Sequence, residues 1–489
     1  MGLPDLGVGL VALPGLGPFL GQLYRAPSVI EIEPQAYWSQ ESVGSALRTN
    51  LDRIDQVVGN SACLIHSVEL AVGGLAGPDP RQWPALIETL DHFDPSWWSD
   101  HAAILATETH HRDRRNFGFL MPPVQTDAAV GMIADRIKSY QDRTGRPFAF
   151  ETGVNYFQPI EGELSDGQFW GEIADRADCG ILLDLHNIWT NERNQRSSLA
   201  STLADMPLER VWELHLADGQ ERKGFWLDAH SGLPQQALLD IAHEWVPRLT
   251  SLHAILFEII PDYVEAFHLE ASDFDHCLAQ LEALWDRRGI AIPSLRAVGS
   301  VGSQSASLPG PVEWEGWLAN GLSYRSPLGP LIADPAMDIY RDLIGAARRG
   351  IIVDALPFSA RFLLRSIGEE QLNDAFEDYL DQTPPRSFAA EEASAFADFA
   401  KRRWQLVHFH DLLAFEVAGH RATISGQDQY IPFSCDPESF LSSIARGEWP
   451  PCVQPGSAIV RVTPPTGIDN SQLPVRSAAL GQLDEVSHG

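Results

Sequence analysis

Short apolar runs alternate with amphipathic segments between residue 5 and about residue 290. The apolar runs are "LGVGLV", "SVIEIE", "ACLIHSVEL", "WWSDHAAIL", "FAFETGV", "GILLDLHN", "VWELHLAD" and "HAILFEII". Helical patterns such as "DAAVGMIADRIKSYQDRTG" and "PQQALLDIAHEWVPRLTSL" lie between them. Strands that alternate with helices indicate parallel strands joined by helical crossovers. The eight runs predict a (β/α)8 barrel, and an open doubly wound sheet is the alternative.

The pattern changes after this region. Residues 297–335 are rich in Gly, Ser and Pro and are predicted to be a linker. Residues 336–424 read as successive short helices, and residues 425–466 as a small winged-helix-like α+β unit in which "QYIPFSC" and "SAIVRVTP" flank a helix. Residues 467–489 are predicted to be a flexible tail. The fold class is therefore α/β, with a TIM-like barrel over residues 1–296 and a mainly helical domain behind it.

Composition and charge exclude several classes of protein. Lys plus Arg number 35 and Asp plus Glu 66, which gives a net charge of −31. Such a chain repels a phosphate backbone, so we expect no nucleic-acid partner. No stretch reads as a signal peptide or membrane span, and the five cysteines are scattered singly, which predicts a cytoplasmic protein without disulfides or membrane contact.

Polar residues recur at the ends of the predicted strands. The carboxyl ends of barrel strands carry the chemistry of this fold, so these side chains are candidate site residues. They are His66, His101 (next to Asp100), Glu151, Asp184, Asn187 (next to His186), His215, Asp228, His230 and Glu258. No Lys or Arg stands among them to balance the carboxylates. Divalent cations would do so, and imidazole with carboxylate suits iron, zinc or manganese.

The spacing of these residues favours a multinuclear metal site. Asp184 and Asn187 stand three residues apart, and Asp228 and His230 two apart, so each pair could face one ion. The alternative is that each histidine is a hydrogen-bonded core residue. We expect His92, His110 and His111, which lie in predicted loops, and His253, which precedes its strand, to be structural or solvated and not part of the site.

The ordered set of motifs resembles the multinuclear non-heme iron-dependent oxidative enzymes. The motifs are "IHSVEL", "WSDHAAI", "ETGVNYF", "LLDLHN", "ELHLADG", "DAH" and "LFEI", in order over residues 5 to about 290. The resemblance implies a TIM-type barrel in which the nine residues above are iron ligands. It also implies that Glu151, Asp184, His215 and Glu258 act in catalysis, that two or three iron ions of mixed valence are the cofactor, and that O2 is a co-substrate.

Three positions depart from the family motifs. His186 replaces the first Asn of the LLD-x-N-N motif, so it could be an extra ligand or an outer group. Thr152 replaces the Asn beside the glutamate, and Gly219, after Asp218, replaces the last His of EIHLAGH. These changes leave the nine candidate ligands intact and bear on the substrate pocket.

The C-terminal half is similar to the helical partner proteins encoded beside such enzymes. The matching elements include Tyr340-Arg341, Leu356-Pro357, "YLDQTPPRS", "FADF" and "LLAFEVA". In those systems the partner binds the precursor peptide and delivers it, so the resemblance implies that enzyme and partner are fused here. A generic helical domain is the alternative.

Together these features predict an oxidase or oxygenase that modifies a ribosomally synthesised precursor peptide, at Cys or another C-terminal residue. The first alternative is a zinc- or manganese-dependent sugar isomerase or phosphoester hydrolase, related to the xylose-isomerase and apurinic-endonuclease barrels. The second is a non-enzymatic scaffold that stores metal.

Overall fold

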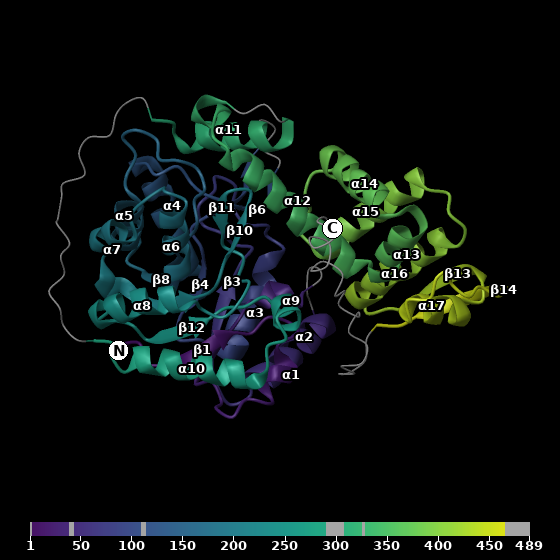
Figure 1. The fold of residues 1–489 in the computed structure, drawn as a ribbon, viewed down its shortest axis with the longest axis horizontal. Helices are drawn as coiled ribbons and strands as arrows, with labels where there is room; N and C mark the ends of the chain where they lie inside the picture. The colour runs from purple at the N-terminus through teal and green to yellow at the C-terminus, as the bar shows by residue number, and fades with distance from the viewer. Residues whose placement is uncertain (1, 39–43, 109–113, 290–307, 325–327, 465–489) are drawn as a thin grey trace, which may run out of the picture. The chain divides into compact units, whose positions relative to one another are not determined.

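The computed structural model describes residues 2–38, 44–108, 114–289, 308–324 and 328–464. The chain divides into two compact units, one of residues 1–37 and 54–340 and one of residues 38–53 and 341–489. We refer to them as the barrel unit and the C-terminal unit, and Figure 1 shows the elements of each. His110, His111 and the predicted tail from residue 467 lie outside the described residues.

The barrel unit contains a closed barrel of eight parallel strands, as the sequence predicted, and not an open sheet. Neighbouring strands follow the order of the chain around the barrel, and the first strand closes onto the last. The strands are β1 (Gly7–Val11), β2 (Val29–Ile32), β3 (Ala62–Ser67), β4 (Trp98–His101), β7 (Phe148–Glu151), β8 (Gly180–Asp184), β9 (Val211–Leu216) and β12 (Ala254–Phe257).

Helices follow the barrel strands and cover them on the outside (Figure 1). They are α1 (Gly17–Leu20), α3 (Gln82–Phe93), α4 (Asp127–Thr144), α5 (Asp166–Ala177), α6 (Leu185–Arg193), α7 (Leu199–Asp205), α8 (Gln236–Trp245), α9 (Pro261–Ala266) and α10 (Ala271–Trp285), with short 3-10 turns at η1 (Pro34–Tyr37), η2 (Leu208–Arg210) and η3 (Val246–Arg248). Helix α2 (Gly44–Val58) is divided between the two units at residue 53. Thr126 accepts a hydrogen bond from the Ala129 amide to cap α4, and Ser165 and Gln168 form a capping box on α5, so the sequence itself starts these two helices.

The inside of the barrel is built in layers, because alternate residues of a strand point to the same side. An apolar cluster contains Val29, Leu64, Trp97, Ala149, Leu182, Ala254 and Leu256. Two residues further along their strands, polar side chains follow: Glu31, His66, Ser99, Glu151, Asp184 and Glu258 are all buried. The strand period of two therefore places a polar layer directly above the apolar one, at the carboxyl ends of the strands.

Two antiparallel hairpins extend the loops at the carboxyl ends. Strands β5 (Ile104–Glu108) and β6 (Arg114–Met121) pair after β4, and β10 (Gln220–Arg222) and β11 (Phe225–Leu227) pair after β9. Helix α11 (Pro311–Tyr324) and the turn η4 (Gly329–Ile332) lie within the segment predicted as a linker. Helix α11 is anchored to the barrel unit, since Trp314 is buried and its Nε1 donates to the Pro122 carbonyl at 2.9 Å.

The C-terminal unit is mainly helical, in agreement with the sequence. Helix α12 (Ala336–Ala355) begins in the barrel unit and continues here, followed by α13 (Pro357–Ile367), α14 (Glu369–Gln382), α15 (Ala389–Arg403) and α16 (Phe409–Ser425). Strands β13 (Gln429–Cys435) and β14 (Pro455–Val462) form a two-stranded antiparallel sheet and flank α17 (Pro437–Ala445), which confirms the predicted strand–helix–strand order. Phe396, Phe409 and Phe440 belong to an apolar core cluster of this unit.

Two smaller expectations can be compared with the structure. His253 does precede its strand, and its Nδ1 lies 3.0 Å from Asp5 Oδ1. The prediction that His92 lies in a loop was wrong. It lies in the last turn of α3, where Nε2 is 3.0 Å from Asp55 Oδ2 and where a basic residue is favourable for the helix dipole. No described helix is long and apolar enough to cross a membrane.

Candidate metal centre

Glu151 lies at the middle of the polar layer. Its Oε2 is 3.0 Å from His66 Nε2 and 3.1 Å from His101 Nδ1, while its Oε1 accepts a 3.3 Å hydrogen bond from the Asn187 side-chain amide. The ligand atoms of His66, His101 and Glu151 all lie within 4.8 Å of one another. One carboxylate at the end of β7 therefore joins side chains from β3, β4 and α6.

Asp184 and His215 extend the group on the other side of Glu151. The three side chains again offer donor atoms within 4.8 Å of one another. Asp184 ends β8 and caps helix α6, with Oδ1 accepting from the Asn187 amide at 2.9 Å. This cap explains why the apolar strand ends in "DLHN": the first turn of α6 projects from the mouth of the barrel and carries His186 and Asn187 with it.

Asp228, His230 and Glu258 form the third part of the site. His230 bridges the two carboxylates, with Nε2 3.0 Å from Asp228 Oδ1 and Nδ1 3.0 Å from Glu258 Oε1. His230 has a φ of 45°, a backbone conformation that side-chain-bearing residues rarely adopt and that often occurs at functional sites. His215 Nδ1 lies 3.7 Å from Glu258 Oε2, which connects this part to the others.

The structure thus brings all nine candidate ligands into one continuous cluster. Their roles as iron ligands or catalytic groups stay predictions, because bringing residues together does not identify the ion. His101, Asp228 and His230 are the most open, with side chains 17%, 22% and 19% exposed, whereas the His215 side chain is 1% exposed. A substrate would therefore approach on the side of these three residues.

Two buried glutamates, Glu31 and Glu213, were not among the predicted site residues. Glu31 Oε2 lies 2.9 Å and Glu213 Oε1 3.5 Å from His215 Nε2, and the three residues make a further group that could hold an ion. Trp97 Nε1 donates to the other oxygen of Glu213 at 2.8 Å. Both glutamates lie inside the strand runs "SVIEIE" and "VWELHL" and not at their ends. A carboxylate in the middle of an apolar run was the signal that could have revealed them.

Burial controls the protonation of the cluster. Burial, together with the charge of Glu213, raises the pKa of Glu31 to about 8, and burial with the charge of Asp228 raises that of Asp184 to about 6. Burial lowers the pKa of His101 to about 4 and that of His66 well below its usual range. Burial also opposes a charge on His215, but Glu31 and Glu213 outweigh it and raise its pKa.

Several oxygen atoms of the cluster that could bind a metal ion accept no hydrogen bond. Asp184 Oδ2 and Asn187 Oδ1 are buried and have no hydrogen-bond partner among the described residues. A buried polar atom without a partner costs about 1–3 kcal/mol, so native proteins seldom leave one uncompensated. An ion bound between these oxygens and the neighbouring imidazoles would compensate them. The residues present therefore fit a group of metal ions.

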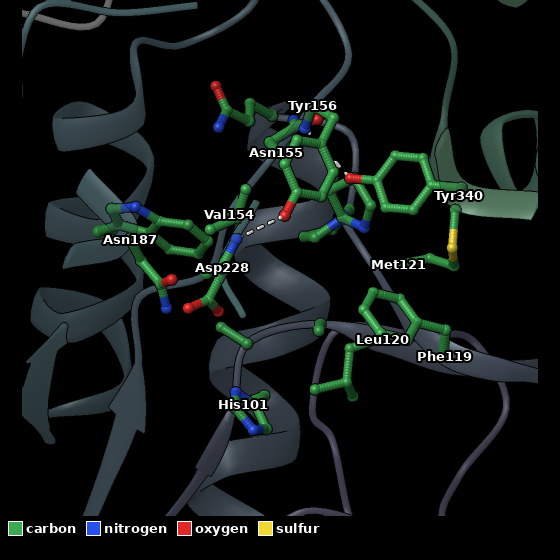
Figure 2. A pocket seen from close by; sticks show the side chains of 17 residues that line it. His101, Phe119, Leu120, Met121, Val154, Asn155, Tyr156, Asn187, Asp228 and Tyr340 are labelled. Carbon is green, nitrogen blue, oxygen red and sulfur yellow. Dashed lines mark hydrogen bonds between the residues drawn. The ribbon is translucent and has the colours of Figure 1, made fainter. Parts of the chain in front are cut away.

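A pocket opens above the cluster (Figure 2). His101, Asn187 and Asp228 line its polar side together with Val154, and the opposite wall is apolar, with Phe119, Leu120, Met121 and Tyr340. Tyr156 lies between the two sides: its hydroxyl accepts from the Asp228 amide at 3.1 Å, and its own amide donates to the Tyr340 hydroxyl at 3.2 Å. Tyr340 therefore contributes to this pocket from the start of α12.

The fold and the position of the cluster define an enzyme site, because active sites of (β/α)8 barrels lie at the carboxyl ends of the strands. The chain belongs to the family described as the RiPP precursor modification enzyme MbnB/TglH/ChrH, whose model matches residues 20–272. The predicted resemblance to multinuclear iron-dependent oxidative enzymes is thereby confirmed at the level of the family.

Individual relatives agree with this family. A "UPF0276 protein" of Chromobacterium violaceum is 30% identical over 167 residues, which is 34% of this chain and 59% of that relative, less than two thirds of its length. A second one, from Vibrio vulnificus, is 26% identical over 258 residues, 52% of this chain and 84% of the relative.

Solved structures show only a general likeness. A D-psicose 3-epimerase of Clostridium cellulolyticum H10, crystallised with D-tagatose, is 12% identical, with a TM-score of 0.36 and coverage of 58% of this chain and 100% of the epimerase. A likeness of this degree carries no information about substrate.

Proposed function

We propose that the chain is an oxygen-dependent multinuclear iron enzyme that oxidatively modifies a ribosomally synthesised precursor peptide. The observation that carries this proposal is the buried cluster of imidazoles and carboxylates with unpartnered donor atoms, in a member of a precursor-modifying family. Iron is the ion that best fits both the mixed nitrogen and oxygen donors and an oxidative reaction.

The candidate ligands divide into three neighbouring groups that would hold two or three ions. His66, His101 and Glu151 form the first group, Glu151, Asp184 and His215 the second. Asp228, His230 and Glu258 form the third, joined by the two 3.0 Å contacts of His230. Bound iron would supply the change of oxidation state and the reaction with O2 that protein side chains do not provide.

The chain's own residues would place the substrate and exclude water. A peptide side chain that enters the pocket meets His101, Asn187 and Asp228 on one side and the apolar wall from Phe119 to Pro122 on the other. The apolar wall keeps water from the reacting group, and the buried rings of Tyr156 and Tyr340 limit the width of the pocket. This arrangement suits an uncharged side chain of a peptide.

The C-terminal unit would bind the precursor, as its resemblance to the partner proteins implies. Among the described residues the sheet of β13 and β14 has only these two strands, so an extended peptide could add to a strand edge. Tyr430 and Ile459 on its outer face are 63% and 73% exposed. We expect Tyr430→Ala combined with Ile459→Ala to weaken precursor binding several-fold, measured by fluorescence anisotropy, while the iron content stays unchanged.

A zinc- or manganese-dependent reaction on a phosphoester is less well supported by the pocket. The residues that line it include no Lys or Arg that would hold a phosphate. A neutral sugar would not need such a residue, so metal identity and oxygen dependence are the distinguishing observations.

Mass spectrometry of candidate precursors tests the proposal. The iron-loaded chain would be incubated with peptides encoded next to its own gene, with and without oxygen. We expect a mass change that needs both iron and O2 and that Glu151→Gln abolishes. An unchanged product yield without oxygen, or with zinc in place of iron, would contradict the proposal.

A further inference from the structure

His186 has no solvent exposure and contacts a candidate metal ligand. It lies in the first turn of α6, where its side chain makes two contacts on opposite sides of the ring. Nδ1 lies 3.2 Å from Asp228 Oδ1, and Nε2 lies 3.4 Å from the indole Nε1 of Trp226. His186 thus connects Asp228, a candidate ligand at the mouth of the site, to hairpin strand β11.

Trp226 is contacted by two residues of α6 and by Asn194, the residue that follows the helix. Besides the contact with His186, the guanidinium of Arg193 lies 3.5 Å from the centre of the indole ring. The Asn194 side chain accepts from the Trp226 amide and donates to its carbonyl, both at 2.8 Å. The direction of the indole N–H is therefore fixed by the fold and does not depend on the long hydrogen bond alone.

These contacts assign the proton on His186. An indole N–H can only donate a hydrogen bond, so His186 Nε2 has to accept it. The ring is then the neutral tautomer with its proton on Nδ1, and Nδ1–H donates to the Asp228 carboxylate. The tautomer of an imidazole is commonly set in this way by the partner of its other nitrogen.

Gly219 provides the space for this pair. A Cβ atom at this position would lie 2.8 Å from His186 Nε2, 2.5 Å from Trp226 Nε1 and 2.3 Å from the Leu227 carbonyl oxygen. Real Cβ atoms do not approach other atoms so closely, so a side chain at 219 is incompatible with the present positions of His186 and Trp226. The two departures from the family motifs, at 186 and 219, thus lie against each other.

We propose that His186 is a positioning residue that orients Asp228 toward the metal cluster through its Nδ1–H, with Trp226 fixing its tautomer and Gly219 leaving room for both. Asp228 Oδ1 is then contacted by both His186 and His230, and the Tyr156 hydroxyl accepts from the Asp228 backbone amide. His186 is an outer group and not a tenth ligand, because Nε2 is engaged by the indole and Nδ1 by the carboxylate.

The inference rests on the proposed metal site and can be tested without a substrate. Iron affinity would be measured by competition with a chelator, and the Mössbauer spectrum recorded, for the parent chain and for His186→Phe, His186→Asn and Trp226→Phe. Asparagine keeps an N–H close to the position of Nδ1, whereas phenylalanine keeps the ring but no donor. Thermal melting of each metal-free variant reports on folding.

We expect His186→Phe to lower iron affinity about 10- to 100-fold, the usual effect of losing an outer partner of a metal ligand. His186→Asn should keep the affinity to within a few-fold, and Trp226→Phe should have a smaller effect than His186→Phe while altering the spectrum. If His186→Phe does not fold, His186→Leu replaces it in the comparison with asparagine.

Two results would overturn the inference. Equal iron affinity and spectra for the parent and His186→Phe would show that the contact with Asp228 does not matter. Equal losses in His186→Phe and His186→Asn would show that the imidazole itself is needed, as for a direct ligand. Failure of the parent chain to bind iron would instead contradict the proposed function, so the two failures can be told apart.

Discussion

The barrel unit and the C-terminal unit bury charged residues in opposite ways. In the barrel, Asp184, Asn187, Glu213 and His230 all keep buried side-chain atoms without a hydrogen-bond partner. In the described residues 341–464 no buried side-chain nitrogen or oxygen lacks one. There Glu392 accepts from Arg348 Nε and Nη2, the Tyr379 hydroxyl and the Arg386 amide. Unpartnered atoms that gather in one cluster of imidazoles and carboxylates indicate a binding site, whereas a buried charge with all its partners in place belongs to the fold and is costly to break.

The largest expected effect concerns Glu151, the carboxylate shared by two groups of candidate ligands. Glu151→Gln should remove at least one metal ion per chain and all activity. The metal-free variant should melt no lower than the metal-free parent, because burial and the charges of Asp184 and Glu258 already oppose a charge at this position. Metal analysis and calorimetry measure the two quantities. Glu163→Gln, at a buried ion pair with Arg196 outside the cluster, is the control that should keep the metal.

The opposite outcome is expected for Glu392 in the C-terminal unit. Glu392→Gln leaves Arg348, 3% exposed, without its counter-charge and should lower the free energy of unfolding by about 3–5 kcal/mol, measured by urea denaturation. Metal content should not change. Glu377→Gln is the matched control, since its pair with Arg349 is more exposed and should contribute less than about 1 kcal/mol. Loss of metal in Glu392→Gln would contradict the assignment of a structural role to the buried charges of the C-terminal unit and of metal binding to those of the barrel unit.

A change at Gly219 tests how tightly the cluster is packed. Gly219→Ala should destabilise the barrel by about 1–3 kcal/mol, because the new methyl group meets the Leu227 carbonyl and the side chains of His186 and Trp226. Thermal melting of the metal-free protein measures this effect. Gly131→Ala is the control, since a Cβ there would meet no atom within 4 Å and its helix α4 favours alanine. Equal melting temperatures for the two variants would contradict the packing described here.

The smallest expected effect is a pH dependence at Glu315 of α11. Burial raises the pKa of this carboxyl from 4.5 to about 7, although the Leu75 amide donates to its Oε1 at 2.6 Å. The folded protein then binds the proton more strongly than the unfolded chain, so this group's contribution to stability falls as the pH rises from 4.5 to about 7 and is constant above that. Glu315→Gln should reduce the fall in melting temperature between these two pH values. An unchanged pH profile would argue against a buried, protonated Glu315.

Local patterns predicted the barrel and its nine candidate ligands because both follow from strand period and from the ends of apolar runs. The glutamates Glu31 and Glu213 escaped detection, since only the closed barrel brings Glu31 of β2 close to His215 and Glu213, which both lie in β9. Helix α11 lies in a stretch whose Gly, Ser and Pro content indicated a linker, and the burial of Trp314 and Leu318 outweighs that local signal.

The role of His186 could not be read from the sequence for a similar reason. Its possible roles as a ligand or an outer group differ only in what its two ring nitrogens contact. The contacts come from Trp226 and Asp228, about forty residues later in the chain. No local sequence pattern connects these positions. The fold brings them together, because the hairpin of β10 and β11 places Trp226 and Asp228 beside His186.

Metal analysis of the chain purified from iron-supplemented cells, with Mössbauer spectra of the same sample, tests the central claim most directly. We expect two to three irons per chain, with ferric and ferrous ions together. Stoichiometric zinc or manganese without iron, or no bound metal, would contradict it.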